Sequence, residues 1–367
     1  MSRLTKPFKM MPEDFRTATT RREKLLHGLH LSTSIGVEIG ALCRPCVRKE
    51  DGSVIYVDHA DTAALRAKYA GDPNVNLDAL VEVGGVWGSN TLQDAIGGRF
   101  VDYVVASHVV EHVPDLIAWL QELASILRPT GEVRLAVPDG RFTFDMRRRV
   151  TQLQDVLVSY IARARVPQPH SMLDFALSVV HPSPNSFWNQ DARESASTIY
   201  TLDQALTLAR DILLNGNYHD IHCWVFTPSS FAELMHAIAR AGLTDLACDG
   251  FYDTSAGEAE FFVRLRRSAY PEYIAESWQR MARHAYEIPL SAPVDRWRSL
   301  FSGFRGFWSE RAPSEHDERD ARQALGVPST FDAAQYLRVN EDVRRAGEDA
   351  ITHFRHHGWR EGRAPAA

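Results

Sequence analysis

Short apolar segments alternate with amphipathic segments along the first part of the chain. The apolar segments are TSIGVEIGAL, GSVIYVDHAD, the weaker PNVNLDAL, RFVDYVVAS and GEVRLAVPD. Between the last two, PDLIAWLQELASILRPTG places leucines at three-to-four spacing, which indicates a helix with one apolar face. Continuous apolar strands that alternate with helices predict a parallel sheet covered by helices on both faces.

The alternation stops at residues 140–218 and then resumes. In FTPSSFAELMHAIARAGL, Thr227 is the expected cap, Pro228 opens a helix and Gly242 closes it. TDLACDGFYD and AEFFVRLRR follow with no helix between them, so they are expected to pair antiparallel. The predicted organisation is an α/β core over 1–147 and 219–267, a helical insertion over 148–218, a helical extension over 268–325, and a small helical module over 326–367.

Composition excludes several classes of protein. A net charge of −6 over 367 residues gives no overall field for nucleic acid. The first residues lack the apolar core of a secretory signal, and no stretch has the ~18 apolar residues of a membrane span. Four cysteines are too few for a disulfide framework, so we expect a cytoplasmic protein. Cys43 and Cys46 form a C-x-x-C without a second pair, which favours two ordinary thiols over a zinc or redox site.

The stretch SHVVEHVPD contains His108, Glu111 and His112 in the order H-x-x-E-H, a zinc signature of metallopeptidases. That chemistry requires a helix, on which both histidines share one face. Here a strand precedes the motif, and Pro114 opens the helix that follows it. The motif is therefore predicted to form the turn at the carboxyl end of the fourth strand, where open α/β sheets bind ligands. This position favours a ligand-binding turn over a peptidase.

Taken together, VEIGAL, VIYVDHAD, the segment from VDYVVASHVVEHVPD to LAVPD, and the late strand pair resemble the class I S-adenosylmethionine-dependent methyltransferases. The resemblance covers about residues 30–147 and 219–267. It implies an α/β fold with a Rossmann-like, seven-stranded, mostly parallel sheet whose last strand is antiparallel. It also implies S-adenosylmethionine as the cofactor.

The residues at the strand ends suit this cofactor. GALCRP keeps Gly40 but lacks the further glycines with which G-x-G-x-x-G approaches a pyrophosphate. Glu38 suits the cofactor's ammonium group, and Asp58 can accept both ribose hydroxyls, although capping or buried pairing would also explain these acids. The resemblance further implies that Asn76 and Asp78, after the third strand, contact the adenine. The predicted cofactor-binding residues are Glu38, Gly40, Ala41, Asp58, Asn76, Asp78, Ser107 and His108.

Transfer of a methyl group to an oxygen requires alignment of the reactants and a base for the hydroxyl proton. His108 is the first candidate for that base, His112 the second and Asp139 in VPDGRF the third. For His112, a hydrogen bond to the backbone is an equal alternative. Quinone-pathway O-methyltransferases carry E-x-x-E-H at this turn and use a divalent ion. A metal held by His108, Glu111 and His112 is therefore possible here, but the sequence favours no metal.

A narrower resemblance suggests the acceptor. EIGAL, SHVVEHVPD, AVPDGRFTFD and HCWVFTP occur in the same order in methyltransferases of bacterial polysaccharide and lipopolysaccharide biosynthesis. The last forty residues resemble a helical module of glycan-assembly enzymes, which would then be partners. His219, His222 and Trp224 are the candidate acceptor contacts, with core packing as the alternative. The predicted activity is methylation of a sugar hydroxyl on a surface glycan; a small phenolic acceptor, or a binding module without turnover, are the alternatives.

Overall fold

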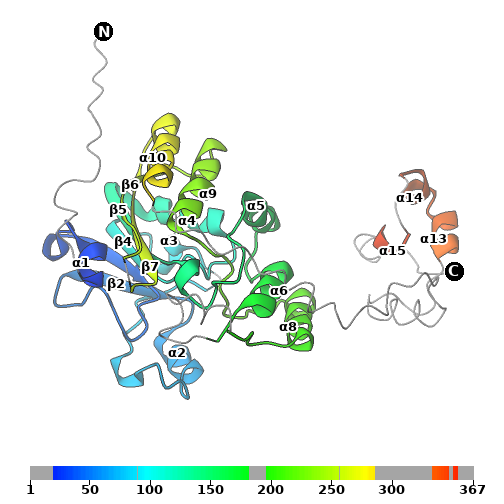
Figure 1. Ribbon diagram of the computed structural model, residues 1–367, viewed down its shortest axis with the longest axis horizontal. Helices are drawn as coiled ribbons and strands as arrows, with labels where there is room; N and C mark the ends of the chain where they lie inside the picture. Colours follow the sequence, from blue (N-terminus) through cyan, green and yellow to red (C-terminus); the bar gives the residue numbers. More distant parts are fainter. Residues whose placement is uncertain are drawn as a thin grey trace, which may run out of the picture. The chain divides into compact units, whose positions relative to one another are not determined.

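The computed structural model describes residues 20–88, 90–181, 196–255, 257–285, 333–346 and 350–353. The chain divides into two compact units, residues 1–294 and 295–367. The larger unit contains a single seven-stranded sheet with the order β3-β2-β1-β4-β5-β7-β6 (Figure 1). Its strands are β1 (Ile35–Ile39), β2 (Ser53–Asp58), β3 (Gly85–Val86), β4 (Val101–Ser107), β5 (Leu127–Pro138), β6 (Leu246–Tyr252) and β7 (Glu260–Arg267).

Every strand except β7 runs in the same direction. β1 pairs in parallel with β2 and with β4, whereas β7 lies antiparallel between β5 and β6. The predicted mostly parallel, seven-stranded sheet with an antiparallel last strand is therefore confirmed. Because β1 has β2 on one side and β4 on the other, the sheet reverses its order between β1 and β4, which is where such folds bind ligands.

Strand register brings the candidate residues to one edge of the sheet. Ile39 is opposite both Val57 of β2 and Ala106 of β4. The residues that follow these three positions therefore leave the sheet side by side. At the other end of the edge, the antiparallel β7 begins at Glu260, which is paired with Pro138 of β5.

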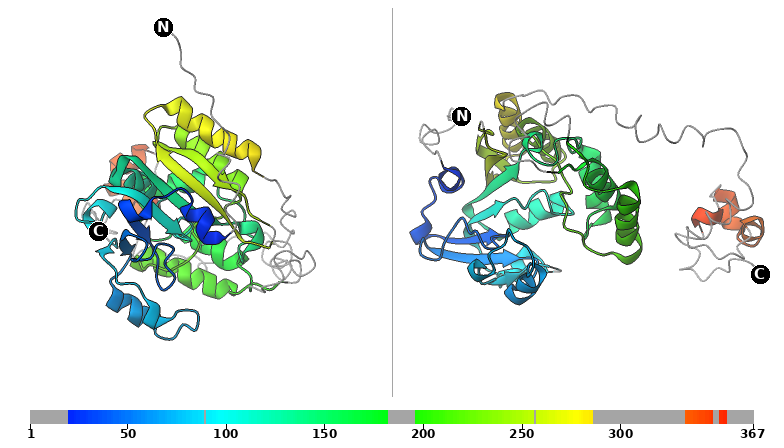
Figure 2. Two further views of the ribbon diagram at one scale, coloured as in Figure 1. Left: turned by 90° about the vertical axis from the view of Figure 1, so that its left-hand side faces the viewer. Right: turned by 60° about the horizontal axis from the view of Figure 1, so that its bottom comes forward.

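Two apolar layers cover the sheet. One face packs against α4 (Leu116–Ile126), α9 (Pro228–Arg240) and α10 (Pro271–His284), and the opposite face carries α1 (Arg21–Leu26), as the two views of Figure 2 show. Within β1, Val37 and Ile39 face the first layer, while Gly36 lies under Tyr103 on the second. A Cβ at Gly36 would lie 1.9 Å from Tyr103 Cζ, so only glycine allows the tyrosine ring to lie there.

Local signals explain where the main helices begin. The carboxylate of Asp115 accepts a hydrogen bond from the Ala118 amide at the start of α4. α9 has the predicted Thr227 cap and opens with Pro228. The shorter elements of the core are η2 (Leu31–Thr33), α2 (Thr62–Lys68), η3 (Leu77–Ala79), α3 (Leu92–Ala95) and η4 (Gly140–Phe142).

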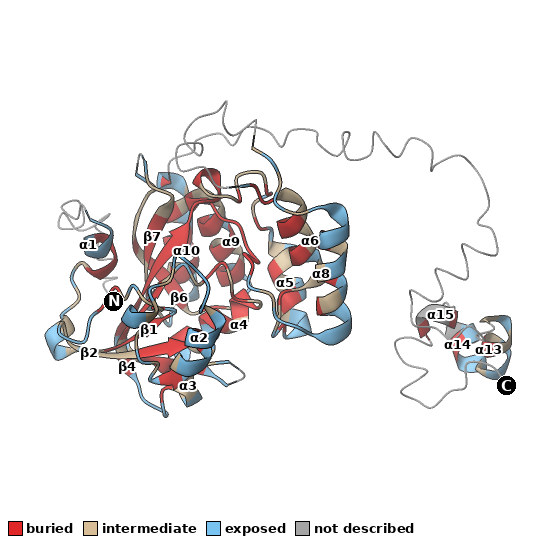
Figure 3. Cartoon of the chain, turned by 90° about the horizontal axis from the view of Figure 1, so that it is seen from below, coloured by how far each residue is buried: buried red, intermediate tan, exposed pale blue. Residues whose placement is uncertain are grey.

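The interval predicted to be a helical insertion contains α5 (Leu153–Ala162), α6 (Pro169–Ser178) and α8 (Leu202–Asn215). Their outward faces are exposed and their inner faces are buried (Figure 3). Val156, Met172 and Ile212 belong to the same apolar cluster as the sheet. The assignment of this region to the acceptor stays a prediction.

One sequence expectation needs correction. PNVNLDAL is not the third strand: residues 77–79 form a 3-10 turn, and the strand is the short β3 at Gly85–Val86. The propensity of the first segment was outweighed by Asn76, whose side chain accepts a hydrogen bond from the Asp78 amide and starts the turn. α10 lies within the predicted helical extension 268–325 and packs on α9 and β6, with Trp278 fully buried. Residues 286–325 of that extension lie outside the described residues, and the domain division stays a prediction.

The smaller unit, described by itself, contains α13 (Ala333–Val339), α14 (Glu341–Ala346) and α15 (Ala350–His353). Tyr336 and Ala350 form its centre, and the Tyr336 hydroxyl lies 3.0 Å from His353 Nδ1. Among the described residues of both units, no helix has the length and apolar character needed to cross a bilayer.

Candidate functional site

Glu38, near the end of β1, organises the loop that follows that strand. Its side chain is buried, and its two carboxylate oxygens accept hydrogen bonds from the backbone amides of Cys46 (2.7 Å) and Val47 (2.8 Å). Burial raises the pKa of Glu38, and these two hydrogen bonds oppose the rise. In this structure Glu38 therefore binds the loop, whereas the sequence suggested a contact with a cofactor ammonium group.

Gly40 begins the same loop in the left-handed region, with φ at +70°. A Cβ there would lie 3.0 Å from Val109 Cγ2 in the turn after β4, and the backbone conformation itself disfavours other residues. The neighbouring Ala41 is buried. The loops after β1 and β4 thus approach each other closely at the point where the strand order reverses.

Asp58 ends β2 at the same edge. Its Oδ1 accepts a hydrogen bond from the His59 amide at 2.7 Å and lies 2.6 Å from His59 Nδ1, while the contacts described for Asp58 do not involve Oδ2. Asn76 and Asp78, predicted to follow the third strand, instead precede it and are exposed. The structure therefore does not give these two residues the strand-end position on which their assignment to adenine depended.

The residues after β4 form a turn, as predicted, and α4 does not begin until Leu116. His108 adopts a left-handed conformation, with φ at +53°, and its Nε2 lies 2.8 Å from Glu260 Oε2. Arg21 of α1 donates to Glu260 Oε1 at 2.6 Å and to the Ser107 hydroxyl. Burial opposes ionisation of Glu260, but His108 and Arg21 outweigh it and keep the pKa of Glu260 below its ordinary value.

Glu111 lies at the centre of a second cluster. The side chain is fully buried, and neither carboxylate oxygen has a hydrogen-bond partner. Oε1 lies 3.7 Å from His108 Nδ1, 3.8 Å from His112 Nε2 and 3.9 Å from His222 Nε2. Three imidazoles thus surround one buried carboxylate, and two of them come from the H-x-x-E-H motif.

The segment around His222 reaches this cluster through backbone pairing. The amides of Cys223 and Trp224 donate to the Glu111 carbonyl, at 2.7 Å and 3.2 Å. Trp224 Nε1 donates to the Val113 carbonyl at 2.7 Å. The two histidine-containing stretches that the sequence analysis treated separately are therefore one structural site.

Carboxylates lie behind two of the imidazoles. His222 Nδ1 is 2.5 Å from Asp145 Oδ2, and His112 Nδ1 is 2.9 Å from Asp220 Oδ1, although that second pair is not aligned for a linear hydrogen bond. Burial opposes ionisation of Asp145, but His222 and the buried Arg148 outweigh it and lower its pKa. Burial also opposes protonation of His112, but Asp220 and Glu111 outweigh it and raise the pKa of His112.

Three predicted site residues have other roles in the structure. Asp139 is completely buried and held by Arg141, with contacts of 2.6–3.1 Å, so it is not free to act as a base. His219 Nε2 lies 2.7 Å from Asp211 of α8 rather than beside His222. Trp224 belongs to the apolar core and offers no ring face to a sugar.

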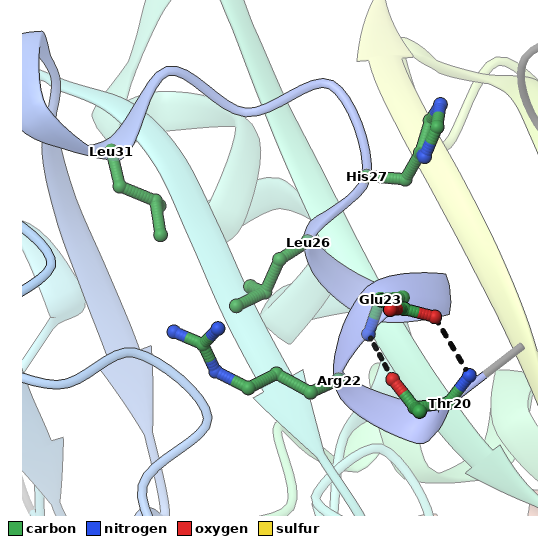
Figure 4. A pocket seen from close by; sticks show the side chains of 6 residues that line it. All are labelled: Thr20, Arg22, Glu23, Leu26, His27 and Leu31. Carbon is green, nitrogen blue, oxygen red and sulfur yellow. Dashed lines mark hydrogen bonds between the residues drawn. The ribbon is translucent and has the colours of Figure 1, made fainter. Parts of the chain in front are cut away.

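A cavity of about 360 Å³ lies elsewhere, on α1. Figure 4 shows its lining and the hydrogen bonds by which Thr20 and Glu23 cap each other at the start of the helix. The cavity is lined by Thr20, Arg22, Glu23, Leu26, His27 and Leu31. None of the candidate site residues lines it; they lie at the carboxyl edge of the sheet.

Sequence reasoning missed several members of both clusters. Arg21 lies outside the quoted segments, and Glu260 lies in AEFFVRLRR, where the pattern indicates only a strand; the fold brings both to the edge. Asp145 and Asp220 stand close to motifs that were recognised, in AVPDGRFTFD and HDIHCW, but nothing in their spacing indicates an imidazole partner.

Comparison with protein families gives one match: a family model described as a methyltransferase domain matches residues 34–247. This range includes β1 to β5, both histidine-containing stretches and the helical insertion. No curated protein matches the chain.

Solved structures resemble the chain at low identity. The CcbJ methyltransferase from Streptomyces caelestis is 12% identical over 70% of this chain and 99% of its own, with a TM-score of 0.35. A structure described among Zn-dependent alcohol dehydrogenases from Rhodobacter sphaeroides is 14% identical, over 68% and 89%, with a TM-score of 0.35. An S-adenosylmethionine-dependent methyltransferase from Mesorhizobium loti is 14% identical, over 67% and 98%, with a TM-score of 0.31. Scores this low carry no functional argument.

Proposed function

Because this chain belongs to the methyltransferase domain family, we propose that it transfers a methyl group from S-adenosylmethionine to a hydroxyl group. We further propose that this hydroxyl group belongs to a sugar of a bacterial surface glycan. The observation that carries the proposal is the position of His108. It follows β4 at the reversal of strand order, it is partly exposed, and its Nε2 lies 2.8 Å from Glu260.

The residues at the sheet edge fit the cofactor. Asp58 keeps one carboxylate oxygen outside its described contacts, which suits a ribose hydroxyl. Gly40 lets the backbone approach a ligand closely, and Glu38 keeps the loop in place. Arg21, beside Ser107, suits the carboxylate of the cofactor's amino-acid end. When bound, S-adenosylmethionine supplies a methyl group on a positively charged sulfur.

His108 would act as the base. If Nε2 carries its proton toward Glu260, Nδ1 keeps a lone pair that can accept the proton of the acceptor hydroxyl. Bound S-adenosylmethionine would supply the methyl group and its sulfur would keep the electron pair of the bond given up, while His108 would take the hydroxyl proton and pass it to solvent. The Glu260 carboxylate would stabilise the imidazolium, as an acid does behind a catalytic histidine.

The sugar acceptor rests on the order of sequence motifs shared with methyltransferases of bacterial polysaccharide and lipopolysaccharide biosynthesis. The helices α5, α6 and α8 would supply the acceptor side, and the C-terminal module would contact glycan-assembly enzymes. Both assignments are proposals to be tested on the full-length protein.

The experiment combines binding with product analysis. Calorimetry should show S-adenosylmethionine binding to the full-length protein. Labelled methyl donor should then be incubated with deoxysugar and hexose oligosaccharides and, separately, with a catechol. We expect label on an oligosaccharide, a mass gain of one methylene group in the product, and loss of transfer in His108→Gln.

Two controls separate the parts of the proposal. His284→Gln changes an exposed histidine at the end of α10, outside both the sheet edge and the helices proposed for the acceptor, so it should keep transfer. Label on the catechol alone would replace the sugar by a phenol. Absence of cofactor binding would overturn the enzymatic proposal and leave a binding module.

A further inference from the structure

We propose that Glu111 Oε1, His112 Nε2 and His222 Nε2 together bind a divalent first-row transition-metal ion, with Zn²⁺ the best fit. One ligand atom from each of these three residues lies within 4.8 Å of the other two, and Glu111 Oε1 lies 3.8 Å from His112 Nε2 and 3.9 Å from His222 Nε2. The site does not coincide with the set that the sequence made conceivable, because His222, not His108, supplies the third ligand.

Glu111 is buried without a hydrogen-bond donor to either carboxylate oxygen. A buried carboxylate without hydrogen bonds is costly, because burial removes the water that would solvate the charge. Glu111 is fully buried, and neither of its oxygens has a hydrogen-bond donor. A cation at Oε1 would compensate for this loss of hydration.

The neighbouring aspartates influence which ring nitrogen of each imidazole carries the proton. The Nδ1 atoms of His222 and His112 lie 2.5 Å and 2.9 Å from aspartate oxygens. A carboxylate at one ring nitrogen favours the proton there, which leaves a lone pair on the other. For His222, whose Nδ1 contacts Asp145 at hydrogen-bond distance, this leaves the Nε2 lone pair facing Glu111. His112 Nδ1 is not aligned with Asp220, so a metal ion would have to displace any proton on His112 Nε2. Two imidazole nitrogens and one carboxylate oxygen that face the same space are the arrangement of a metal site.

Ligand chemistry and distance bear on which ion fits. Two imidazoles and a carboxylate suit zinc and its neighbours, whereas magnesium and calcium prefer oxygen ligands alone. Ligand atoms around a tetrahedral zinc lie about 3.4 Å apart, given bonds of about 2.0–2.1 Å. The separations of 3.8 Å and 3.9 Å from Glu111 exceed this value by about 0.5 Å. The ligand atoms of His112 and His222 lie within 4.8 Å of each other, so they would have to approach by up to about 1.4 Å.

The surrounding structure would hold such ligands firmly. Asp145, behind His222, is held by Arg148 Nη1 at 2.8 Å, and the Arg148 side chain is completely buried. The amides of Cys223 and Trp224 pair with the Glu111 carbonyl, which fixes one ligand segment against the other. Outer carboxylates that orient histidine ligands are a regular feature of metal sites.

The ion would serve the acceptor, and this step rests on the proposed methyl transfer. Three protein ligands leave a coordination position open on a four-coordinate ion. A hydroxyl bound there loses its proton more readily, because the cation stabilises the alkoxide. His108, whose Nδ1 lies 3.7 Å from Glu111, is close enough to the same position to receive that proton.

The test measures metal directly on the untagged full-length protein. After treatment with chelator and its removal, Zn²⁺ is titrated by calorimetry, and Co²⁺ is added separately for its visible spectrum. We expect one zinc per chain and cobalt absorption typical of nitrogen and oxygen ligands. Glu111→Gln and His222→Gln should each weaken zinc binding by about 100-fold, since even an outer-shell partner contributes roughly 10–100-fold.

The matched control is a substitution at His219, three residues before His222 in the chain. His219→Gln removes an imidazole from the same stretch but outside the cluster, so zinc affinity should not change. Circular dichroism and urea unfolding show whether each variant folds, and Glu111→Gln, which keeps the side-chain volume, remains informative if His222→Gln does not. Equal zinc binding by the wild-type protein, Glu111→Gln and His222→Gln, or no zinc binding at all, would overturn the proposal and leave protonated imidazoles as partners of Glu111.

Cofactor binding is measured on the same samples. If S-adenosylmethionine binds and zinc does not, the metal proposal fails and the proposed methyl transfer stands. If zinc binds with the predicted dependence on Glu111 but S-adenosylmethionine does not bind, the metal site stands and the proposed function fails.

Discussion

Glu38 and Glu111 are both buried glutamates at the carboxyl edge of one sheet, but their surroundings are opposite in kind. Both oxygens of Glu38 accept backbone amide protons, from Cys46 and Val47. Both oxygens of Glu111 lack a hydrogen bond, and the atoms that face it are imidazole nitrogens. The Glu38 carboxylate stabilises the fold of the loop. The Glu111 carboxylate lacks a donor from the chain, as expected for a residue that binds a ligand such as a metal ion.

The comparison shows that burial of an acid does not by itself identify a functional residue. What distinguishes the two glutamates is whether donors of the chain already satisfy the carboxylate. By this criterion, the hydrogen bonds to the buried acid after β1 are all made within the chain, whereas those to the buried acid in the turn after β4 are not. The same substitution at the two positions should therefore have opposite effects.

The largest effect is expected for Glu38→Gln. The amide group of glutamine would direct its own N–H groups at a backbone N–H, leaving a buried donor without an acceptor. We expect a loss of about 2–3 kcal/mol in the free energy of unfolding, measured by urea denaturation, and weaker binding of S-adenosylmethionine. Unchanged stability would contradict the scaffold role of Glu38.

Asp58→Asn tests the ligand-binding part of the same side. Asparagine keeps the size of the side chain but carries no charge, so it would accept a hydrogen bond from a ribose hydroxyl more weakly than the carboxylate does. Affinity for S-adenosylmethionine in calorimetry should fall by about 10- to 100-fold, which is the range for loss of a charged hydrogen bond. Asp78→Asn is the matched control, because Asp78 is exposed on a turn before β3, and it should have no effect. A stronger effect at Asp78 would restore the adenine contact that the sequence suggested.

Glu111→Gln should leave the metal-free protein as stable as the wild type, or stabilise it by up to about 1 kcal/mol. The glutamine amide offers two N–H donors to nitrogens with lone pairs, so this substitution relieves a mismatch that Glu38→Gln creates. The measurement is urea unfolding in the presence of chelator. A loss of several kcal/mol, as expected when a buried ion pair is broken, would show that protonated histidines pair with Glu111.

The smallest effect concerns the loop that Glu38 holds. Burial, and after it the neighbouring Glu38, raises the pKa of Cys46 to about 11. Only about one thiol in a thousand would be ionised at pH 8, and the thiolate is the form that reacts. Iodoacetamide should therefore modify Cys46 more slowly than the less buried Cys43, as followed by peptide mass spectrometry. Glu38→Gln should reduce this difference; equal rates in the wild type would mean that the loop is open.

The β1 side could be predicted from sequence because its contacts are local. The strand, the glycine and the acid at the end of the next strand follow one another in the chain, and β2 and β4 were recognised by their apolar segments. Even here, the role of Glu38 was not predictable, because its partners are backbone amides rather than side chains. The third strand was missed because two residues of β3 give too short a pattern to recognise.

The cluster around Glu111 was beyond sequence reasoning for a different reason. His222 lies 111 residues after Glu111 in the chain, and it arrives there because the amides of Cys223 and Trp224 pair with the turn. The sequence identified His112 and His222 as separate candidates but gave no reason to join them. The spacing of residues in a sequence indicates which side chains lie together on one helix or strand. The contact between His222 and Glu111 instead depends on how two distant segments pack against each other.

Arg21, described above at the sheet edge, has a practical consequence for anyone who trims the chain. It precedes residues 34–247, the part that the family model matches, and Glu260 comes after them. A fragment of residues 34–247 would keep the central strands but would lack Arg21, which contacts Ser107, and Glu260, which contacts His108. A shortened protein should therefore include both α1 and β7, so that Arg21 and Glu260 keep their contacts with Ser107 and His108.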